Sequence, residues 1–303
     1  MTAPTALSLA PDLSLPAVGF GTYLIPDDAA EAVVSDALKA GYRHIDTAEG
    51  YGNERGVGAA VRNSGLSRDA VFVTTKLWPG NLAWGQTPRD EAGTVAALDD
   101  SLQRLGLDHV DLYLVHAPFA PEQRLAQWAG LVEARRQGKA RAIGVSNFTA
   151  EHITALVDAG LPLPQANQIE LHPWSQKPAL VAWLRAHGVQ PIAYSSLVPL
   201  STWRATPGQD SAKTEQMKAD GARDDSPFRR MAARHGVTEA QVLLRWAVQQ
   251  GYAVLPKSTN PGRIRANLDL FSFSLDEGEL AEIATMDRGG GVAWAVGDPT
   301  TFG

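Results

Sequence analysis

Eight short apolar segments, each separated from the next by an amphipathic or polar stretch, constrain the fold of this chain more than any other feature. The apolar segments occupy residues 17–20, 42–46, 71–76, 110–116, 140–145, 165–170, 189–194 and 252–256. Residues 27–40, 88–105, 121–137 and 238–250 have the periodicity of surface helices. Alternating strands and helices favour a parallel sheet, and eight strands in 303 residues predict an α/β fold, a (β/α)8 TIM barrel that forms one domain over residues 1–303.

Local signals refine this prediction. Pro88 and the acids after it predict a helix start, and Gly138 follows a basic last turn. The stretch "LSLAPDLSLP" predicts an N-terminal β-hairpin that caps the bottom of the barrel, and residues 200–226 predict a long loop after the seventh strand. An open doubly wound sheet is the competing fold, because "GVGAAV" (56–61) resembles part of a dinucleotide motif. It follows a loop rather than a strand, so we favour the barrel.

Composition excludes several classes of function. The chain has no cysteine, which excludes thiol catalysis, thiolate metal sites and disulfides and is compatible with the cytoplasm, where we expect the protein. A net charge of −6 with interspersed signs argues against nucleic-acid or anionic-membrane partners. We find no signal peptide, no apolar run long enough for a membrane span and no HExxH-type spacing, so we expect no metal site. The charge and the lack of a coiled-coil pattern are compatible with a monomer or a weak dimer.

Polar side chains gather where the predicted strands end. They are Asp46, Lys76, His116, Ser146, Asn147, Gln168, Tyr194 and Lys257. In a barrel these carboxyl-terminal ends meet on one face, which is where barrel active sites are built. Each alone has a structural explanation, such as a turn cap for Asp46 or a hydrogen-bonded structural role for His116. Their common position favours a catalytic site.

Three of these residues and a nearby tyrosine suggest proton transfer. Tyr51 lies five residues after Asp46, and a phenol has an ordinary pKa of about 10. A neighbouring ammonium, Lys76, is expected to lower the pKa of Tyr51, while Asp46 keeps Lys76 charged. His116 can orient a carbonyl or share in the proton transfer. Such an acid is best explained as the partner of a hydride donor.

A basic segment near the C-terminus is a candidate cofactor site. Lys257, Arg263 and Arg265 lie within nine residues, and Ser258 and Thr259 precede a helix predicted at 261–270. A helix N-terminus and arginine both favour phosphate. A solvated basic helix face explains this segment equally well.

The ordered motifs "GFGT" (19–22), "DLYLVHAP", "GVSNF", "NQIELHP" and "PKSTNPGRIRANLD" closely resemble the aldo-keto reductase family over nearly the whole chain. Among its members the chain is most similar to bacterial NADPH-dependent diketogluconate and small-aldehyde reductases. The resemblance implies reduction of aldehydes and ketones to alcohols, with Tyr51 as general acid and Asp46, Lys76 and His116 completing a catalytic tetrad. It implies NADPH or NADP+ as cofactor, with NADH weaker.

The resemblance also implies binding residues. The expected cofactor contacts are Thr22, Asp46, Ser146, Asn147, Gln168, Tyr194, Ser195, Leu197, Lys257, Ser258, Thr259, Arg263 and Asn267. The expected pocket walls, partly from a C-terminal tail over the active-site face, are Tyr23, Trp78, Phe119 and Trp294, and Trp84 is a further candidate. Many members have tryptophan after the tetrad histidine, where this chain has Ala117, so we expect a wider pocket for a small carbonyl substrate.

Two alternatives remain at this point. One is an NADPH-binding sensing or interaction subunit with slow turnover. The other is a barrel aldolase or isomerase that uses Lys76 as a Schiff-base nucleophile.

Overall fold

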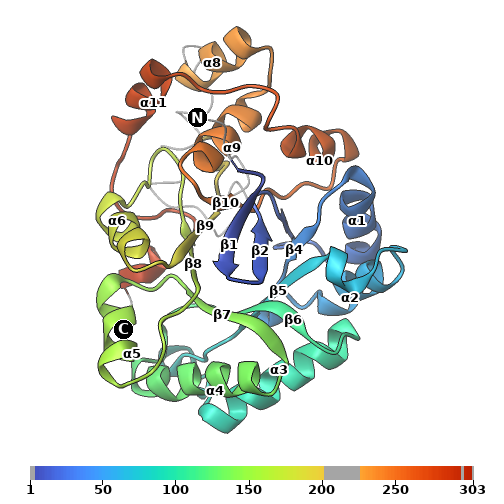
Figure 1. Ribbon diagram of the computed structural model, residues 1–303, viewed down its shortest axis with the longest axis vertical. Coiled ribbons are helices and arrows are strands. Elements are labelled where there is room, and N and C mark those ends of the chain that lie inside the picture. Colours follow the sequence, from blue (N-terminus) through green and yellow to red (C-terminus); the bar gives the residue numbers. More distant parts are fainter. Residues whose placement is uncertain (1–3, 201–225, 295–296, 302–303) are drawn as a thin grey trace.

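Eight parallel strands form one sheet, in which each strand pairs with the next along the chain. The computed structural model describes residues 4–200, 226–294 and 297–301. The strands are β3 (Phe20–Gly21), β4 (His44–Asp46), β5 (Phe72–Leu77), β6 (Val110–Val115), β7 (Ala140–Ser146), β8 (Ala166–Glu170), β9 (Gln190–Tyr194) and β10 (Ala253–Val254). Val18 forms a parallel bridge with Val254, so the first and last strands also meet and the sheet curls into a barrel (Figure 1). The predicted fold class is confirmed, and each apolar segment supplies one strand.

Helices surround the sheet (Figure 1). They are α1 (Asp27–Ala40), α2 (Glu54–Arg62), α3 (Glu91–Leu105), α4 (Arg124–Arg136), α5 (Ala150–Asp158), α6 (Pro178–Ala186), α8 (Pro227–His235), α9 (Glu239–Gln249), α10 (Pro261–Leu268) and α11 (Glu277–Ala284). The helix start predicted at Pro88 is wrong by three residues, because the Asp90 side chain caps the Gly93 N–H and α3 begins after it. The predicted helix 121–137 begins instead with a 3-10 turn over Pro121–Gln123.

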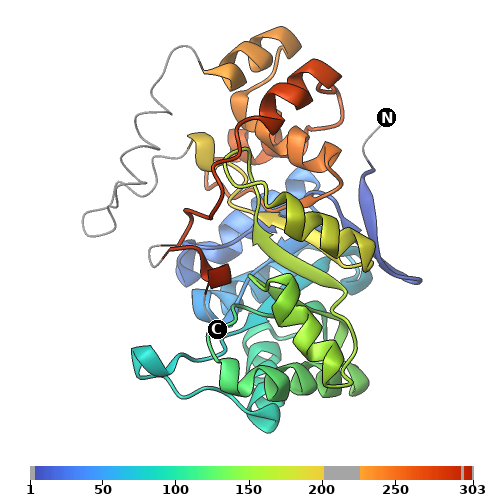
Figure 2. The same ribbon diagram turned by 90° about the vertical axis from the view of Figure 1, so that its left-hand side faces the viewer.

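The N-terminal hairpin closes the bottom of the barrel, as expected. Its strands β1 (Ala6–Ala10) and β2 (Leu13–Pro16) are antiparallel. Leu9, Leu13 and Leu15 share one apolar cluster with barrel residues such as Leu112 and Ile192. The hairpin and the C-terminal tail lie on opposite sides of the sheet (Figure 2). The tail is therefore placed at the other end, where the strands finish.

The stretch "GVGAAV" serves helix packing rather than phosphate binding. It lies inside α2, and α2 packs between α1 and α3. A Cβ on Gly56 would lie 2.5 Å from the carbonyl oxygen of Asp27, and one on Gly58 would lie 1.9 Å from that of Leu105. Both glycines allow close contacts between helices. The stretch lies within a helix and serves packing, which supports the choice of the barrel over the open sheet.

The loop predicted at 200–226 falls almost wholly on 201–225, outside the described residues, and stays a prediction. Within the described ranges, no helix is long and apolar enough to cross a membrane.

Candidate active site

The predicted tetrad comes together at the carboxyl-terminal end of the barrel. Asp46 ends β4, Lys76 lies late in β5 and His116 follows β6. Tyr51 ends a 3-10 turn, η1 (Glu49–Tyr51), directly after β4. Parallel strands end on the same face, so residues up to 70 positions apart become neighbours.

Lys76 is the centre of this group. Its Nζ donates to Asp46 Oδ1 at 2.5 Å, to the Thr47 carbonyl at 2.9 Å and to the Tyr51 hydroxyl at 3.3 Å. Burial alone would lower the pKa of Lys76, but the Asp46 carboxylate and Tyr51 outweigh it and raise that pKa. Lys76 therefore carries a positive charge at neutral pH, and all three of its N–H bonds have acceptors.

The expected fall in the pKa of Tyr51 is not found in this structure. Burial is the largest influence and raises that pKa; Lys76 lowers it as expected, but by less. Tyr51 is therefore protonated at neutral pH, which is the state that a proton donor requires. The pKa of His116 lies well below its ordinary value, through burial first and the charge of Lys76 second, so its imidazole is neutral.

Gln168 has a role that the sequence did not indicate. Its amide nitrogen donates to Asp46 Oδ2 at 2.7 Å, so both carboxylate oxygens of Asp46 are held. The Thr22 hydroxyl donates to the main-chain carbonyl of Asp46 at 3.0 Å. These two expected cofactor residues thus also fix the residue that orients Lys76.

Three expected nicotinamide contacts lie beside the tetrad. Ser146 Oγ donates to the Gln168 carbonyl at 2.8 Å, and Asn147 Nδ2 donates to the His116 carbonyl at 2.9 Å. The Tyr194 hydroxyl donates to Asn147 Oδ1 at 2.7 Å.

Two of the expected cofactor residues, Asn147 and Ser195, have left-handed backbones, with φ of 64° and 55°. Non-glycine residues in this conformation concentrate at functional sites.

The basic segment forms a pair of neighbouring cations. Burial and then the charge of Arg263 lower the pKa of Lys257, so the two side chains are close enough to repel. In the part of the chain that the structure describes, neither has a carboxylate partner. Ser258 and Asn267 are buried beside them, and Thr259 is exposed. Two neighbouring cations at the start of α10, without a carboxylate partner among the described residues, suit a phosphate.

Leu197, a further expected cofactor contact, is partly buried and packs against the main core.

All four expected pocket residues gather around the tetrad, and Trp84 joins them. The ring centroids of Tyr23 and Tyr51 are 5.1 Å apart, and Trp78 lies 5.5 Å from His116. Phe119 contacts Trp78 at 5.9 Å and Trp84 at 5.0 Å. The mouth above Tyr51 and His116 is therefore walled by aromatic rings.

The tail closes one side of this mouth. Trp294 lies 5.9 Å from His116 and 5.5 Å from Phe119, and its Nε1 donates to the Tyr194 hydroxyl at 3.0 Å. Ala117, between His116 and Phe119, is fully buried. The wider pocket expected from Ala117 stays a prediction, and the Trp294 indole from the tail is one wall of the mouth.

Across the described ranges, no three or more acidic or histidine side chains are grouped as metal ligands would be.

Comparisons with known proteins identify the family of this chain. The model of the "Aldo/keto reductase family" matches residues 17–288. The chain is 37% identical over 304 residues to methylglyoxal reductase DkgA of Escherichia coli K12, covering 100% of both chains. It is 39% identical over 290 residues to an aldo-keto reductase of Mycolicibacterium smegmatis, covering 95% of this chain and 94% of the relative.

Solved structures give the same result. A Bombyx mori aldo-keto reductase in complex with NADP has a TM-score of 0.80 and 35% identity, covering 95% of this chain and 94% of the other. An aldo/keto reductase from Brucella melitensis also has a TM-score of 0.80 and 35% identity, covering 94% of this chain and all of the other. By family model, by relatives along its whole length and by fold, the chain belongs to the aldo/keto reductase family.

Proposed function

We propose that this protein reduces the carbonyl group of small aldehydes and ketones to an alcohol with NADPH, and that Tyr51 is the general acid. One observation carries the proposal. A buried, charged Lys76 lies 3.3 Å from the Tyr51 hydroxyl, and that hydroxyl faces the aromatic mouth beside a neutral His116. An acid next to a fixed positive charge is what a carbonyl oxygen needs as negative charge develops on it.

The donors on this face fit a nicotinamide dinucleotide phosphate. Ser146, Asn147, Gln168 and Tyr194 would hold the nicotinamide end, and the Lys257–Arg263 pair would hold the 2′-phosphate. An extra phosphate is the feature that distinguishes NADPH from NADH, and two neighbouring cations that have no acidic partner among the described residues favour it. When bound, NADPH supplies a hydride for the carbonyl carbon.

The residues of the chain then account for the proton. The Tyr51 O–H donates its proton to the carbonyl oxygen and becomes a phenolate. Lys76 stabilises that phenolate, and Asp46 keeps Lys76 charged and in place. His116, neutral and at the mouth, orients the carbonyl oxygen. Aromatic walls exclude water, which strengthens each of these interactions.

The substrates we propose first are short carbonyls, including 2-oxoaldehydes such as methylglyoxal. Relatives that share the whole length of this chain are named methylglyoxal reductase. A mostly apolar pocket with two polar groups at its base suits such compounds.

Schiff-base chemistry at Lys76 is disfavoured. A Schiff-base nucleophile needs a neutral amine, and the pKa of Lys76 is raised rather than lowered. All three of its N–H bonds are also committed to acceptors.

The test is NADPH consumption by the purified protein with methylglyoxal, larger aldehydes and ketones, with Tyr51→Phe in parallel. We expect turnover that falls by roughly 10²–10⁴-fold in the variant, with an NADPH dissociation constant within about twofold of the original. Near-native rates in Tyr51→Phe would refute the proposed acid. Tight NADPH binding without turnover of any carbonyl would favour a sensing subunit.

A further inference from the structure

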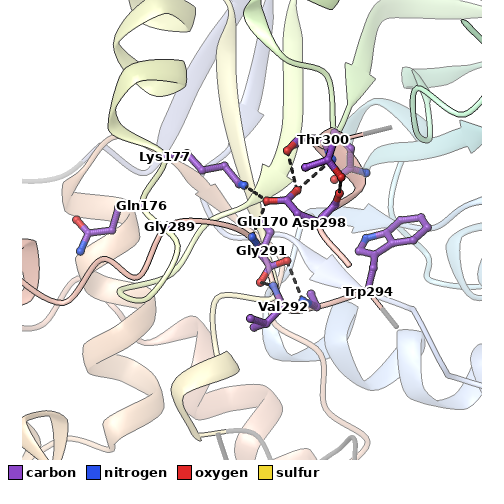
Figure 3. A network of polar contacts seen from close by, with 12 residues as sticks. Glu170, Gln176, Lys177, Gly289, Gly291, Val292, Trp294, Asp298 and Thr300 are labelled. Atoms are coloured by element: carbon purple, nitrogen blue, oxygen red, sulfur yellow. Dashed lines mark hydrogen bonds and ion pairs between the residues drawn. The ribbon is translucent and has the colours of Figure 1, made fainter. Parts of the chain in front are cut away.

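A buried carboxylate holds the tail that carries Trp294. Glu170, at the end of β8, accepts the N–H of Val292 at 2.8 Å and the N–H of Ala293 at 2.9 Å (Figure 3). Its third partner is His172 Nε2 at 2.7 Å. Glu170 is only 1% exposed. Burial would raise its pKa, but these donors lower it overall, so the carboxylate is charged and takes charge-assisted hydrogen bonds from the tail.

A second carboxylate fixes the tail on the other side of Trp294. Asp298 pairs with Lys177 at 2.5 Å and accepts the N–H of Gly291, also at 2.5 Å (Figure 3). The Thr300 hydroxyl donates to Asp298 at 2.7 Å. Lys177 has a left-handed backbone with φ of 46°, an unfavourable conformation for a residue with a side chain. Trp294 thus lies between two anchored points of the chain.

The anchored indole contacts two residues of the loop that follows β6. Trp294 lies against the rings of His116 and Phe119, with centroids 5.9 Å and 5.5 Å away. Its N–H also begins a chain of hydrogen bonds to Tyr194 and from there to Asn147. The tail therefore provides a wall of the pocket and contacts the expected nicotinamide site.

We propose that Glu170 is a positioning residue that fixes Trp294 over the tetrad and thereby restricts the enzyme to compact carbonyl substrates. This inference rests on the proposed reductase activity. Glu170 would act through the backbone N–H groups of Val292 and Ala293, which its carboxylate accepts. In Glu170→Gln one carboxylate oxygen becomes an NH2 group that faces backbone donors, so at least one bond to the tail is lost.

The first experiment measures selectivity. We compare kcat/KM for methylglyoxal and for 2-naphthaldehyde in the original protein, Glu170→Gln, Trp294→Ala and the double variant. We expect both single variants to raise the ratio of naphthaldehyde to methylglyoxal by roughly tenfold. Because Glu170 acts through Trp294, the double variant should match Trp294→Ala rather than multiply the two effects.

A matched control separates positioning from general loosening. Glu279 is also a buried glutamate paired with a histidine, His235, but it lies in α11, away from the tail anchor. Glu279→Gln should leave the substrate ratio unchanged. A shift in that control, or additive effects in the double variant, would overturn the inference.

A second measurement does not depend on activity. Amide hydrogen exchange of the peptide that includes Val292–Trp294 should be faster in Glu170→Gln than in the original protein and in Glu279→Gln. Unchanged exchange would overturn the inference. If Glu170→Gln does not fold, Glu170→Asp, which keeps the charge but withdraws the carboxylate from the Val292 and Ala293 N–H groups, tests the same anchor with the same two measurements and the same outcomes. Failure of the original protein to reduce either aldehyde would instead contradict the proposed function, and the exchange result would still decide whether Glu170 holds the tail.

Discussion

The Nζ of Lys76 and the Oδ1 of Asp46 lie 2.5 Å apart, and both side chains are almost completely buried. Burial by itself favours a neutral lysine, and the carboxylate reverses that preference. Asp46 is in turn held by Gln168 through its other oxygen. The positive charge of Lys76, which faces the Tyr51 hydroxyl, therefore depends on the Asp46 carboxylate.

Asp46→Asn should test whether the charge of Lys76 depends on the Asp46 carboxylate. Without the carboxylate, burial lowers the pKa of Lys76, so the ammonium loses its proton at a lower pH. We expect slower reduction, and a basic limb of the kcat/KM profile that begins at lower pH than in the original protein. Leaving a buried charge without its partner should also cost about 3–5 kcal/mol of unfolding free energy. Initial rates across pH and urea unfolding measure the two effects.

The control is Asp111→Asn. Asp111 is buried at the start of β6, far from the tetrad, where it pairs with Arg68 and Arg141. This variant should lose stability without moving the pH profile. An identical profile in Asp46→Asn and the original protein would contradict the proposed role of the carboxylate.

Arg263→Ala should change the choice of cofactor. If Arg263 and Lys257 hold the 2′-phosphate, the dissociation constant for NADPH should rise roughly tenfold, the effect of losing one charged hydrogen bond. The value for NADH should stay within about twofold. Arg265→Ala removes the same charge from the same exposed helix without adjoining Lys257, and it should affect the two cofactors little. Equal losses for NADPH and NADH in Arg263→Ala would refute the assignment. Fluorescence titration of the original protein and the two variants with each cofactor gives the dissociation constants.

The sequence predicted most of the site because strand order determines which residues meet. Once Asp46, Lys76 and His116 are recognised at the ends of parallel strands, barrel geometry brings them to one face without further information. Tyr51 follows because it lies five residues after Asp46, in the same loop. The aromatic walls were predicted from the family resemblance, and their ring contacts support it.

Long-range contacts and burial could not be predicted in this way. Gln168 meets Asp46 across 122 residues, and Glu170 meets Val292 across 122. A signal for Glu170 was present: it lies two positions after Gln168, so both side chains point to the same side of β8. The pKa of Tyr51 depends on how much water the folded chain excludes, and the sequence does not contain that quantity. Its direction was therefore predicted wrongly even though the effect of Lys76 was right.

Gly58→Ala should test the packing explanation of "GVGAAV". An added Cβ would lie 1.9 Å from the carbonyl oxygen of Leu105, which is backbone and cannot move away cheaply. We expect a loss of roughly 2–3 kcal/mol in the free energy of unfolding, from overpacking between α2 and α3. Gly278→Ala is the control, since a Cβ there meets only the end of the Asp276 side chain, at 3.3 Å. It should cost less than about 1 kcal/mol or stabilise α11. Urea unfolding measures both, and equal effects would contradict the explanation.

Asp298→Asn should reveal the anchor of the tail through its pH dependence. Burial would raise the pKa of Asp298, but Lys177 and the Gly291 N–H outweigh it and lower that pKa to about 2. In an unfolded chain the value is about 3.9. A depressed pKa means that the carboxylate stabilises the folded state above about pH 4 and that this stabilisation is lost as the pH falls towards 2. The difference in unfolding free energy between the original protein and Asp298→Asn should therefore be smaller by roughly 1 kcal/mol at pH 3 than at pH 7. A difference that stays constant from pH 7 to pH 3 would mean that Asp298 gains nothing from its ionised form, and the pair with Lys177 could not be what holds the tail beside Trp294.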